Sequence, residues 1–588
     1  MTYLSGLYFI DIKTKQESFS MQNISPKHLS LTGLLPLILP LSVLAAPPDA
    51  GQILQEQRSQ KPLPSQLPPQ ADVEKTPEKT ENGIRILVKG FTFSGYEGLL
   101  SEPELQSLVA KDIGKKLSFD ELQSLVTRVT HYLRSQGWLL ARAYLPDQDI
   151  TSGVIHIAII QGKSDGSLTV IGDETLRIGK EHLQHIGEHA IQKNTPLKAQ
   201  DLERSLLLMN DLPGISAKAS LSPGEAPGTT AVKIKATEGA LFDGSLWFDN
   251  YGNRYTGAER GNAMVNINDP HRIGDRFTFL FTTAEHLKVG QVSYSAPIST
   301  SGLRADLSYT DIRYELGKEL SSLDADGNAH TVNVGVSYPW IRSRRANITT
   351  TVNYEFKDLS DSASGTKLHD KQLHSATLGT AGDMSDVFFG GGVTSWGASV
   401  THGSMNERTA DIAITDTEGS YTFFNINLAR LQKLTKDLMM RVSLRSQYSL
   451  DNLDSSEQFS LGGPYGVRAY PVSEAMGDEG HLFNLEASYA IAIPERFGDL
   501  KWNIFYDAGQ IVLHKNTWAN AISTATNKNR YWLQGAGTGF DYSYDDNLTI
   551  RTSWAHVIGN NDGRSTDDND SDGKNDENRV LFQALWRF

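Results

Sequence analysis

The sequence contains no cysteine in 588 residues. This absence excludes disulfide frameworks, thiolate metal sites and cysteine nucleophiles, and it suits a cell-envelope protein that crosses an oxidising periplasm. Positive charge is also scarce. The 55 Lys and Arg residues are outnumbered by 69 Asp and Glu residues, which gives a net charge of −14, and no Lys/Arg-rich block stands out. These features argue against a nucleic-acid partner.

Long hydrophobic runs are missing after the N-terminal region. No later segment has 18 consecutive apolar residues, so the sequence predicts no membrane-spanning helix. The chain is therefore either soluble or spans a membrane as a closed β-barrel, the other structure that satisfies its backbone in lipid. The sequence also lacks a G-x-S-x-G motif and a P-loop, so we predict no cofactor and no enzymatic activity.

The apolar run near the N-terminus has the pattern of an export signal. It extends from Leu29 to Leu44, and Val43 and Ala45 occupy the −3 and −1 positions of a cleavage site. About 16 residues with two internal prolines are too short and too broken for a membrane anchor. We predict a signal peptide at residues 1–45, in which residues 1–20 look like an upstream extension.

A polar leader follows the predicted signal, in residues 46–82. The Gln-rich stretch Asp49 to Lys61 carries Ile53 and Leu54, and it fits either a short helix or a disordered leader. The proline-rich tract behind it has no periodicity and is typical of an extended linker.

Two segments that mix helix and strand patterns come next. In residues 83–162 the helix pattern near the centre starts with a capping box of Ser118 and Glu121 and stops at Gly137. Residues 163–239 repeat the same order: a strand, two helices and a hairpin. We predict two tandem α/β modules with the order β-α-α-β-β.

From residue 240 to residue 588 helix patterns disappear and strict alternation takes over. Leu303, Ala305 and Leu307, for example, alternate with charged and polar residues. Long alternating runs with turns of very different lengths are typical of a transmembrane barrel, which is apolar toward lipid and polar toward its lumen. At about 22 residues for each strand and turn, this segment holds about 16 antiparallel strands.

The last residues also fit a barrel. In "RVLFQALWRF" every second residue is apolar, and the chain ends on Phe588. A soluble edge strand as apolar as this one would invite aggregation. The segment looks like the closing strand of an outer-membrane barrel, whose C-terminal phenylalanine commonly serves as an assembly signal.

An unusual loop sequence, "SLGGPYGVRAYP", follows a strand pattern late in the chain. It combines Gly462 and Gly463 with Val467, a lone Arg468 and Tyr470. Such a loop, behind two α/β modules and within a barrel, resembles the outer-membrane transporters of two-partner secretion (TpsB type, haemolysin activation and adhesin secretion). In that family the modules are polypeptide-transport-associated (POTRA) domains, and a leader helix plugs the barrel.

Further residues carry the resemblance over nearly all of the predicted mature chain. They are Gly137, Leu145, Pro146, Gln148, Ile150, Gly153 and Gly162 in the first module; Leu206, Asn210, Leu212, Pro213 and Gly214 in the second; and Asn250, Gly252, Thr256, Gly257 and Arg260 in the first barrel hairpin.

The resemblance also implies a partner for Arg468. The family's late loop folds back into the lumen and sets its arginine against the aspartate of a Phe-x-Asp-x-Gly strand, found here as Phe505, Asp507 and Gly509. An enclosed guanidinium needs a carboxylate, to which it can donate two parallel hydrogen bonds. This sequence departs at Ala469, where the family has glycine. If that position needs positive φ, alanine is strained by about 1 kcal/mol or more.

The function implied is an outer-membrane pore of a Gram-negative bacterium. Its POTRA modules lie in the periplasm and recognise one exoprotein, which crosses unfolded and without ATP. The resemblance leaves several classes of cargo open: a haemolysin or other cytolysin, an adhesin, a contact-dependent toxin and a haem-binding protein. Outer-membrane lipid, periplasmic chaperones and the barrel assembly machinery are further expected partners. The alternatives are a barrel assembly or insertion factor, which usually carries more POTRA modules, and a passive diffusion channel, which needs none.

A weaker candidate is a calcium site. Asp568, Asp570 and Asp572 precede Gly573 at the spacing that starts a calcium loop. The acid expected at the twelfth position is replaced by Arg579, so a solvated extracellular loop is the better interpretation.

Overall fold

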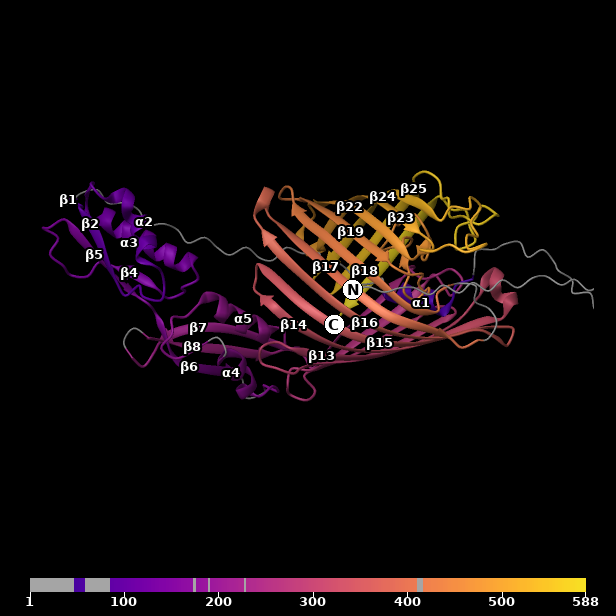
Figure 1. Cartoon of the computed structure of the whole chain (residues 1–588), viewed down its shortest axis with the longest axis horizontal. Coiled ribbons are helices and arrows are strands. Elements are labelled where there is room, and N and C mark those ends of the chain that lie inside the picture. The colour runs from indigo at the N-terminus through magenta and orange to yellow at the C-terminus, as the bar shows by residue number, and fades with distance from the viewer. Residues whose placement is uncertain (1–46, 59–84, 173–175, 189–190, 227–228, 410–415) are drawn as a thin grey trace, which may run out of the picture. The chain divides into compact units, whose positions relative to one another are not determined.

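The computed structural model describes residues 47–58, 85–172, 176–188, 191–226, 229–409 and 416–588 (Figure 1). The predicted signal peptide and most of the predicted linker lie outside the described residues. None of the helices in the described part combines the length and the hydrophobicity that crossing a membrane would require.

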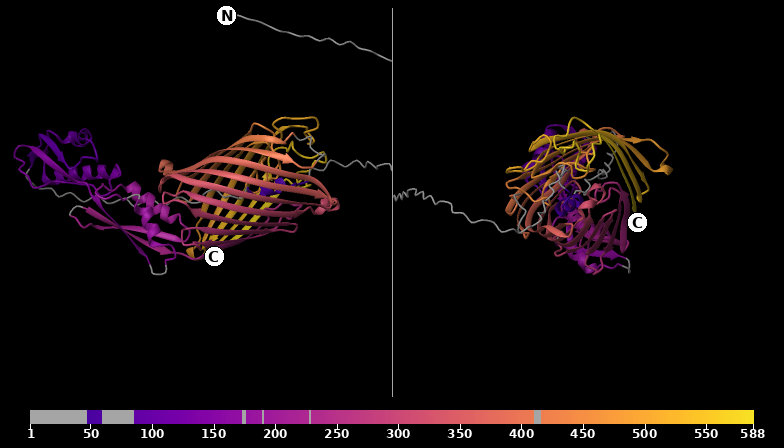
Figure 2. Two further views of the ribbon diagram at one scale, coloured as in Figure 1. Left: turned by 60° about the horizontal axis from the view of Figure 1, so that its bottom comes forward. Right: turned by 90° about the vertical axis from the view of Figure 1, so that its right-hand side faces the viewer.

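Sixteen antiparallel strands close into one barrel, in which the last strand, β26, pairs with the first, β9 (Figure 2). The barrel strands are β9 (Phe242–Asp249), β10 (Arg260–Asn268), β11 (Arg276–Thr283), β12 (Leu287–Pro297), β13 (Arg304–Glu315), β14 (Ala325–Arg342), β15 (Ala346–Ala363), β16 (Thr366–Asp386), β17 (Gly392–Glu407), β18 (Gly419–Lys433), β19 (Leu438–Ser449), β22 (Glu479–Ile491), β23 (Asp499–Val512), β24 (Arg530–Tyr544), β25 (Leu548–Val557) and β26 (Asn578–Arg587). The predicted fold class and strand number are confirmed. The central strands are longer than expected: β16 has 21 residues. Since about 10 residues cross the bilayer, such strands continue beyond it.

The barrel reverses the burial pattern of a soluble protein. Its outer wall exposes large apolar side chains, and Leu307 and Ile426 are 50% and 55% exposed. Charged side chains are instead enclosed by the lumen, where Lys357 and Asp507 are 1% and 0% exposed. Alternation along each strand sends successive side chains to opposite faces, so an apolar outer wall and a polar lumen arise from one sequence pattern.

Module 1 is built from β1 (Ile86–Leu87), β2 (Gly90–Ser94), α2 (Glu102–Val109), β3 (Lys116–Leu117), α3 (Phe119–Ser135), β4 (Arg142–Tyr144) and β5 (Val154–Ile160). Its main sheet has the order β2-β5-β4, with β2 parallel to β5. The predicted capping box is confirmed: the Glu121 amide donates to the Ser118 hydroxyl, and the Ser118 amide donates to the Glu121 carboxylate. Helix α2 was not located from the sequence, although it begins with its own capping box of Ser101 and Glu104.

Module 2 repeats this topology. It contains β6 (Lys163–Gly172), α4 (Lys180–Glu188), α5 (Ala199–Asn210), β7 (Ile215–Pro223) and β8 (Thr229–Glu238). Its sheet has the order β6-β8-β7, with β6 parallel to β8. In both modules the last strand lies in the middle of the sheet, so the first strand and the preceding strand form the two edges.

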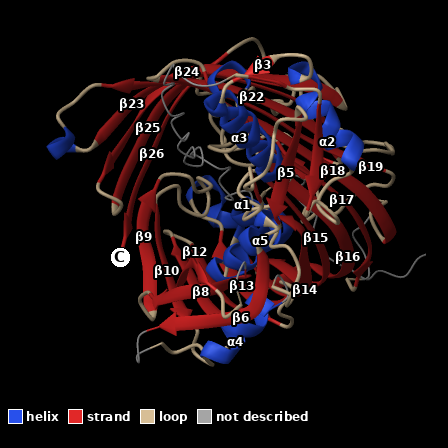
Figure 3. Cartoon of the chain, turned by 90° about the vertical axis from the view of Figure 1, so that its left-hand side faces the viewer, coloured by secondary structure: helices blue, strands red, loops and turns tan. Residues whose placement is uncertain are grey.

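Two pieces of chain that do not belong to the wall occupy the lumen. Helix α1 (Ala50–Arg58) lies inside the ring of strands (Figure 3), next to β14 and β15. Ile53 and Leu54 are 0% and 3% exposed and join an apolar cluster with residues of the barrel. The second piece is the inward loop, residues 450–478 between β19 and β22. Its ends are tied together by β20 (Phe459–Ser460) and β21 (Met476–Gly477).

The seam between β26 and β9 is short. Five residue pairs join Gln583–Arg587 to Ser245–Asp249. At one end the ladder is extended by Phe588, which exchanges two backbone hydrogen bonds with Gly244. At the other end the side-chain amide of Asn250 bonds to the backbone of Val580 and Phe582, where it replaces a backbone pair.

We expect Gly244→Ala to impair closure of the barrel. A methyl group at Gly244 would lie 2.6 Å from the ring of Phe588 and 2.4 Å from the carbonyl oxygen of Met264. The folded fraction, measured by heat-modifiable migration in gel electrophoresis, should fall. Gly290→Ala on β12 is the matched control, because nothing lies within 4 Å of its added methyl. Equal folding of both variants would contradict the expectation.

Candidate functional site

Arg468, at the tip of the inward loop, contacts two carboxylates of the barrel wall. Its Nε and Nη2 donate to the two carboxylate oxygens of Asp507 on β23, at 2.9 and 3.0 Å. Its Nη1 donates to Glu486 on β22 at 2.6 Å, and its backbone amide also donates to Asp507 at 3.2 Å. The side chain thus makes the two parallel hydrogen bonds that favour arginine over lysine at such a position.

The surroundings of this ion pair shield most of it from water. Asp507 is 0% exposed, and the guanidinium carbon of Arg468 lies 3.4 Å from the ring centroid of Phe505. Asn484 donates to Asp507 at 2.8 Å and to the carbonyl of Gly466 at 3.0 Å, so it joins the wall to the loop as well. Removing one partner of such a pair leaves the other charge buried alone, which typically costs about 3–5 kcal/mol.

Glycines shape the tip of the loop. A methyl group at Gly462 would lie 2.1 Å from the carbonyl oxygen of Pro471, so only glycine fits there. Gly463 has φ +98°, a conformation that disfavours other residues. The backbone folds tightly over these positions, since the Val467 amide donates to the Leu461 carbonyl and the Tyr470 amide donates to the Val467 carbonyl. Both Val467 and Tyr470 are fully buried.

Ala469 does not disturb this geometry. Its φ is not positive, so the strain considered for alanine at this position does not arise. The methyl group is fully buried against the wall, where a side chain at Gly535 would come within 2.6 Å of it. The wall therefore makes room for the alanine that replaces the family's glycine.

The wall residues flanking Asp507 also serve the loop. Phe505 supplies the ring over which Arg468 lies. A methyl group at Gly509 would lie 2.4 Å from the side chain of Leu461, so glycine lets the loop approach the wall closely. The sequence did not reveal Glu486 as the second acceptor. Its signal was present but weak: Glu486 is a polar residue on the same face of its strand as Asn484.

One carboxylate of α1 joins three parts of the lumen. Glu56 accepts hydrogen bonds from Asn253 in the β9–β10 connection at 3.0 Å and from Ser473 of the inward loop at 2.6 Å. Glu56 itself is 9% exposed. Helix α1 is thereby connected both to the wall and to the loop that carries Arg468.

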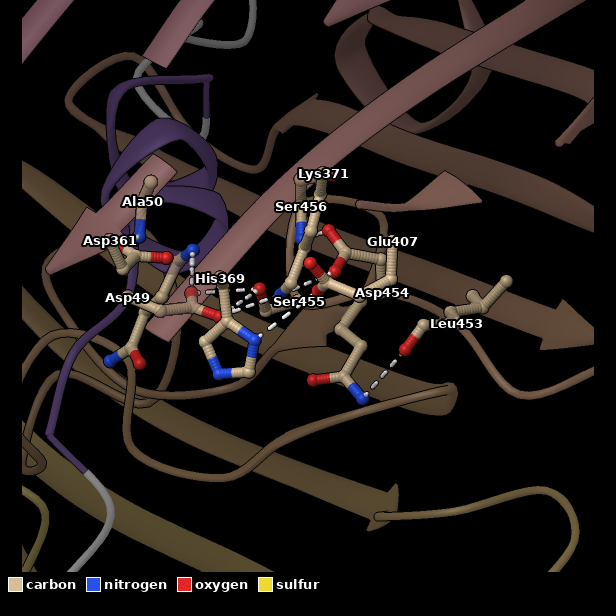
Figure 4. A network of polar contacts seen from close by, with 12 residues as sticks. Asp49, Ala50, Asp361, His369, Lys371, Glu407, Leu453, Asp454, Ser455 and Ser456 are labelled. Carbon is tan, nitrogen blue, oxygen red and sulfur yellow. Dashed lines mark hydrogen bonds and ion pairs between the residues drawn. The ribbon is translucent and has the colours of Figure 1, made fainter. Parts of the chain in front are cut away.

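The N-terminal end of α1 is held by a second network (Figure 4). Asp49 caps the helix by accepting from the Gln52 amide at 2.8 Å, and it also accepts from the hydroxyl of Ser455 in the inward loop at 2.7 Å. Lys371 on β16 lies 3.3 Å from Asp49 and 2.8 Å from Asp454 of the inward loop. These contacts link helix, wall and loop through one buried lysine.

In this structure the three aspartates of the calcium candidate contact arginines. Asp570 pairs with Arg564 at 3.0 Å, and Asp572 pairs with Arg579 at 3.0 Å. Asp568 lies 3.4 Å from Arg564. The three carboxylates therefore meet arginines and do not converge on one point, and no group of three or more potential ligands in the described part of the chain is arranged for a metal ion.

Comparisons with known proteins agree with this architecture. The family model for haemolysin secretion/activation proteins ShlB/FhaC/HecB matches residues 228–540. The model for the ShlB-type POTRA domain matches residues 86–162.

Relatives and solved structures extend the agreement over most of the chain. The heme/hemopexin transporter protein HuxB of Haemophilus influenzae is 26% identical over 78% of this chain and 81% of its own length. The outer membrane transporter CdiB of Dickeya dadantii is 21% identical over 84% of this chain and 89% of its own. Among structures, CdiB from Escherichia coli covers 87% of this chain and 93% of its own with a TM-score of 0.67 at 19% identity, which shows a shared fold.

The stability of α1 in its position inside the lumen should depend on pH through Glu56. This helix lies in the lumen and does not itself span the membrane. Burial raises the pKa of Glu56 from 4.5 to about 7, against the opposing effects of Ser473, Asn253 and Arg260. The seated helix therefore binds a proton more tightly than the released helix, and its stability falls as the pH rises from about 4.5 to about 7.

Single-channel conductance in planar bilayers should accordingly show more frequent opening above pH 7 than near pH 5. Glu56→Gln stays neutral at every pH and can still accept both hydrogen bonds, so we expect it to remove this dependence. An unchanged pH profile in Glu56→Gln would assign the dependence to another group.

Proposed function

Because this chain belongs to the haemolysin secretion/activation protein family ShlB/FhaC/HecB, we propose that it moves one large exoprotein across the outer membrane in an unfolded form. It is an outer-membrane pore of two-partner secretion, with POTRA modules on the periplasmic side and a secreted exoprotein as its partner. The contacts of α1 and of the inward loop inside the lumen support our proposals for the steps of transport and for the residues that control them.

The observation that carries the proposal is how the lumen is filled. Helix α1 and the inward loop occupy it without contributing strands to the wall. Many of the contacts that hold α1 are hydrogen bonds and ion pairs, such as those of Asp49 and Glu56. Water or the backbone of a passing chain can replace such contacts at a modest net cost of about 0.5–1.5 kcal/mol each. A filling of this kind suits a pore that must open for a polypeptide.

The two occupants differ in how firmly they are held. Arg468 is bound to two wall carboxylates, and extracting it would leave Asp507 buried and uncompensated. That cost of about 3–5 kcal/mol falls in one step, whereas the polar contacts of α1 can be exchanged one at a time for contacts with water or with the passing chain. We propose that α1 leaves first when the exoprotein enters, and that Arg468 and Asp507 keep the inward loop in place as a latch.

Capture of the exoprotein falls to the modules. Strands β2 and β4 form the edges of the main sheet of module 1, and an extended segment can add to such an edge through backbone hydrogen bonds. Transport then needs no nucleotide, since folding of the exoprotein outside the cell withdraws it from the pore. In this proposal the chain acts as a channel and not as an enzyme, and periplasmic chaperones and the barrel assembly machinery deliver it to the membrane.

The similarity to a heme/hemopexin transporter bears on the cargo. Among the cargo classes considered from the sequence, a haem-binding exoprotein is the one this relative favours. The alternative role, as a factor that inserts other barrels, shares the fold: BamA from Haemophilus ducreyi has a TM-score of 0.52 at 12% identity. That likeness concerns the fold alone.

Replacing Arg468 by alanine should impair secretion more than barrel insertion. The inward loop would lose its hold on Asp507, while the wall strands keep their ladders. We expect the exoprotein in the medium to fall several-fold at a near-normal level of heat-modifiable barrel in the outer membrane.

Arg408→Ala is the matched control, because it removes an arginine from a more exposed ion pair with Asp358 and Asp370. Exposed pairs contribute little, about 0–1 kcal/mol, so secretion should continue. Normal secretion by Arg468→Ala would refute the latch.

Deletion of the gene should remove a single exoprotein. Mass spectrometry of the medium and the cell surface, compared between parent and deletion strains, would name the cargo and test whether it binds haem. A joint loss of several outer-membrane barrels, with every exoprotein still present, would favour the assembly factor instead.

A further inference from the structure

The turn between β16 and β17 carries a group of exposed apolar side chains. Val387, Phe388 and Phe389 are 83%, 63% and 74% exposed, although they follow one another directly. The rings of Phe388 and Phe389 pack against each other, with centroids 4.2 Å apart. Nothing in the folding of the wall requires two phenylalanines here, so their exposure calls for a partner.

The turn is rigid. The side-chain amide of Gln432 lies within 3.0 to 3.1 Å of the carbonyl oxygens of Phe388, Phe389 and Gly391. Phe389 has φ +45°, a conformation that bulky residues rarely adopt. A strained backbone that is held by hydrogen bonds from Gln432 indicates that the direction of these side chains has a function.

A polar cluster supports the turn from the adjoining strands. Arg430 on β18 pairs with Asp386 through two hydrogen bonds of 2.8 and 3.0 Å. It also donates to Gln432 and to Thr394 on β17. Asp386 accepts in turn from the Phe388 amide at 3.0 Å, so the cluster reaches the turn itself.

The turn lies on the lipid-facing side of the wall. Thr394 shares its strand face with Trp396, and Arg430 and Gln432 share theirs with Leu428. Trp396 and Leu428 are 36% and 47% exposed, as expected of residues that face lipid. The backbone of the turn is bonded to Gln432 on this outer face, and its apolar side chains are exposed next to the lipid-facing surface.

The turn also lies at the periplasmic end of the barrel. The chain enters β9 from module 2, and each later strand reverses direction. Strand β16 is the eighth strand of the barrel, so it ends where β9 begins. Aromatic side chains favour this level of a bilayer, where lipid headgroups meet the acyl chains.

The surface around the turn carries more positive than negative charge. Arg345, whose carbonyl accepts from the Ser385 amide, is exposed, as are Lys433 and Lys436. Asp386 is neutralised by Arg430, and Asp437 is the acidic neighbour of Lys436. The excess of positive charge attracts anionic lipid at the membrane surface.

We propose that residues 387–391 form an anchor that inserts Phe388 and Phe389 into the headgroup region of the periplasmic leaflet, next to anionic phospholipid. The anchor fixes this side of the barrel at one depth in the bilayer. It requires the outer-membrane location of the chain but is independent of its cargo and of the latch.

The absence of cysteine makes the proposal directly testable. Phe389→Cys in the full chain can be labelled at one position with a polarity-sensitive fluorophore. Ser124→Cys, on the exposed surface of α3 in module 1, is the control for a position in the periplasmic water. Each labelled protein is placed in vesicles of phosphatidylethanolamine and phosphatidylglycerol that contain a lipid with a nitroxide near its headgroup.

We expect the nitroxide lipid to quench the probe at position 389 several-fold more than the probe at position 124, and iodide in the water to quench it less. The difference should shrink when phosphatidylglycerol is omitted. Equal lipid quenching at the two positions would overturn the anchor. Protection from iodide without lipid quenching would also overturn it and would indicate a protein partner.

Phe388→Cys provides a second probe if the label at position 389 prevents folding, which heat-modifiable migration reveals. Phe388 is not held at positive φ, so it tolerates replacement better than Phe389. Its probe should give the same ordering relative to position 124.

Discussion

The contact between Arg468 and Asp507 decides what the lumen of this barrel can hold. A guanidinium enclosed by a protein wall is stable only when carboxylates compensate it, and here two of them do so. Their positions on β22 and β23 fix the tip of the inward loop. The fixed loop then presents Ser455 and Ser473 to Asp49 and Glu56 of α1. The position of the helix in the lumen therefore depends on this ion pair through the inward loop.

The two faces of each barrel strand require side chains of opposite polarity. This requirement explains why apolar and polar residues alternate along the strands. The hydrocarbon core of the membrane accepts only apolar side chains on the outer wall, while the lumen accepts charge as long as each charge is compensated. Lys371 illustrates the second requirement, since it is nearly buried yet lies between Asp49 and Asp454. A lumen built from compensated charges can be filled by a helix and a loop that contribute no strand to the wall.

The sequence predicted the parts of the structure that arise from short-range patterns. Alternation gave the barrel, and the capping box gave the start of α3. The pairing of Arg468 with Asp507 followed from a family resemblance together with the need of a buried arginine for a carboxylate. The contacts of Glu56 could not be predicted in this way, because its partner Ser473 is 417 residues away and an isolated Ser gives no signal.

Predictions from local sequence patterns also missed contacts with other segments of the same chain. Ala469 suggested strain, but the wall at Gly535 leaves room for it. The spacing of Asp568, Asp570 and Asp572 suggested a cation, whereas Arg564 and Arg579 occupy their carboxylates. In both cases the deciding residue lies on another segment, and spacing along one segment contains no information about it.

The chain distances of these contacts imply an order of assembly. Arg468 is 18 residues from Glu486 and 39 from Asp507, which lie on the two strands that directly follow the inward loop. The loop can therefore bind these strands while the sheet is still open. The seam joins β9 to the last strand of the chain, so the tube cannot close before its final residues arrive. Since contacts close in sequence form faster than distant ones, we expect the inward loop to bind the wall before the seam between β9 and β26 closes.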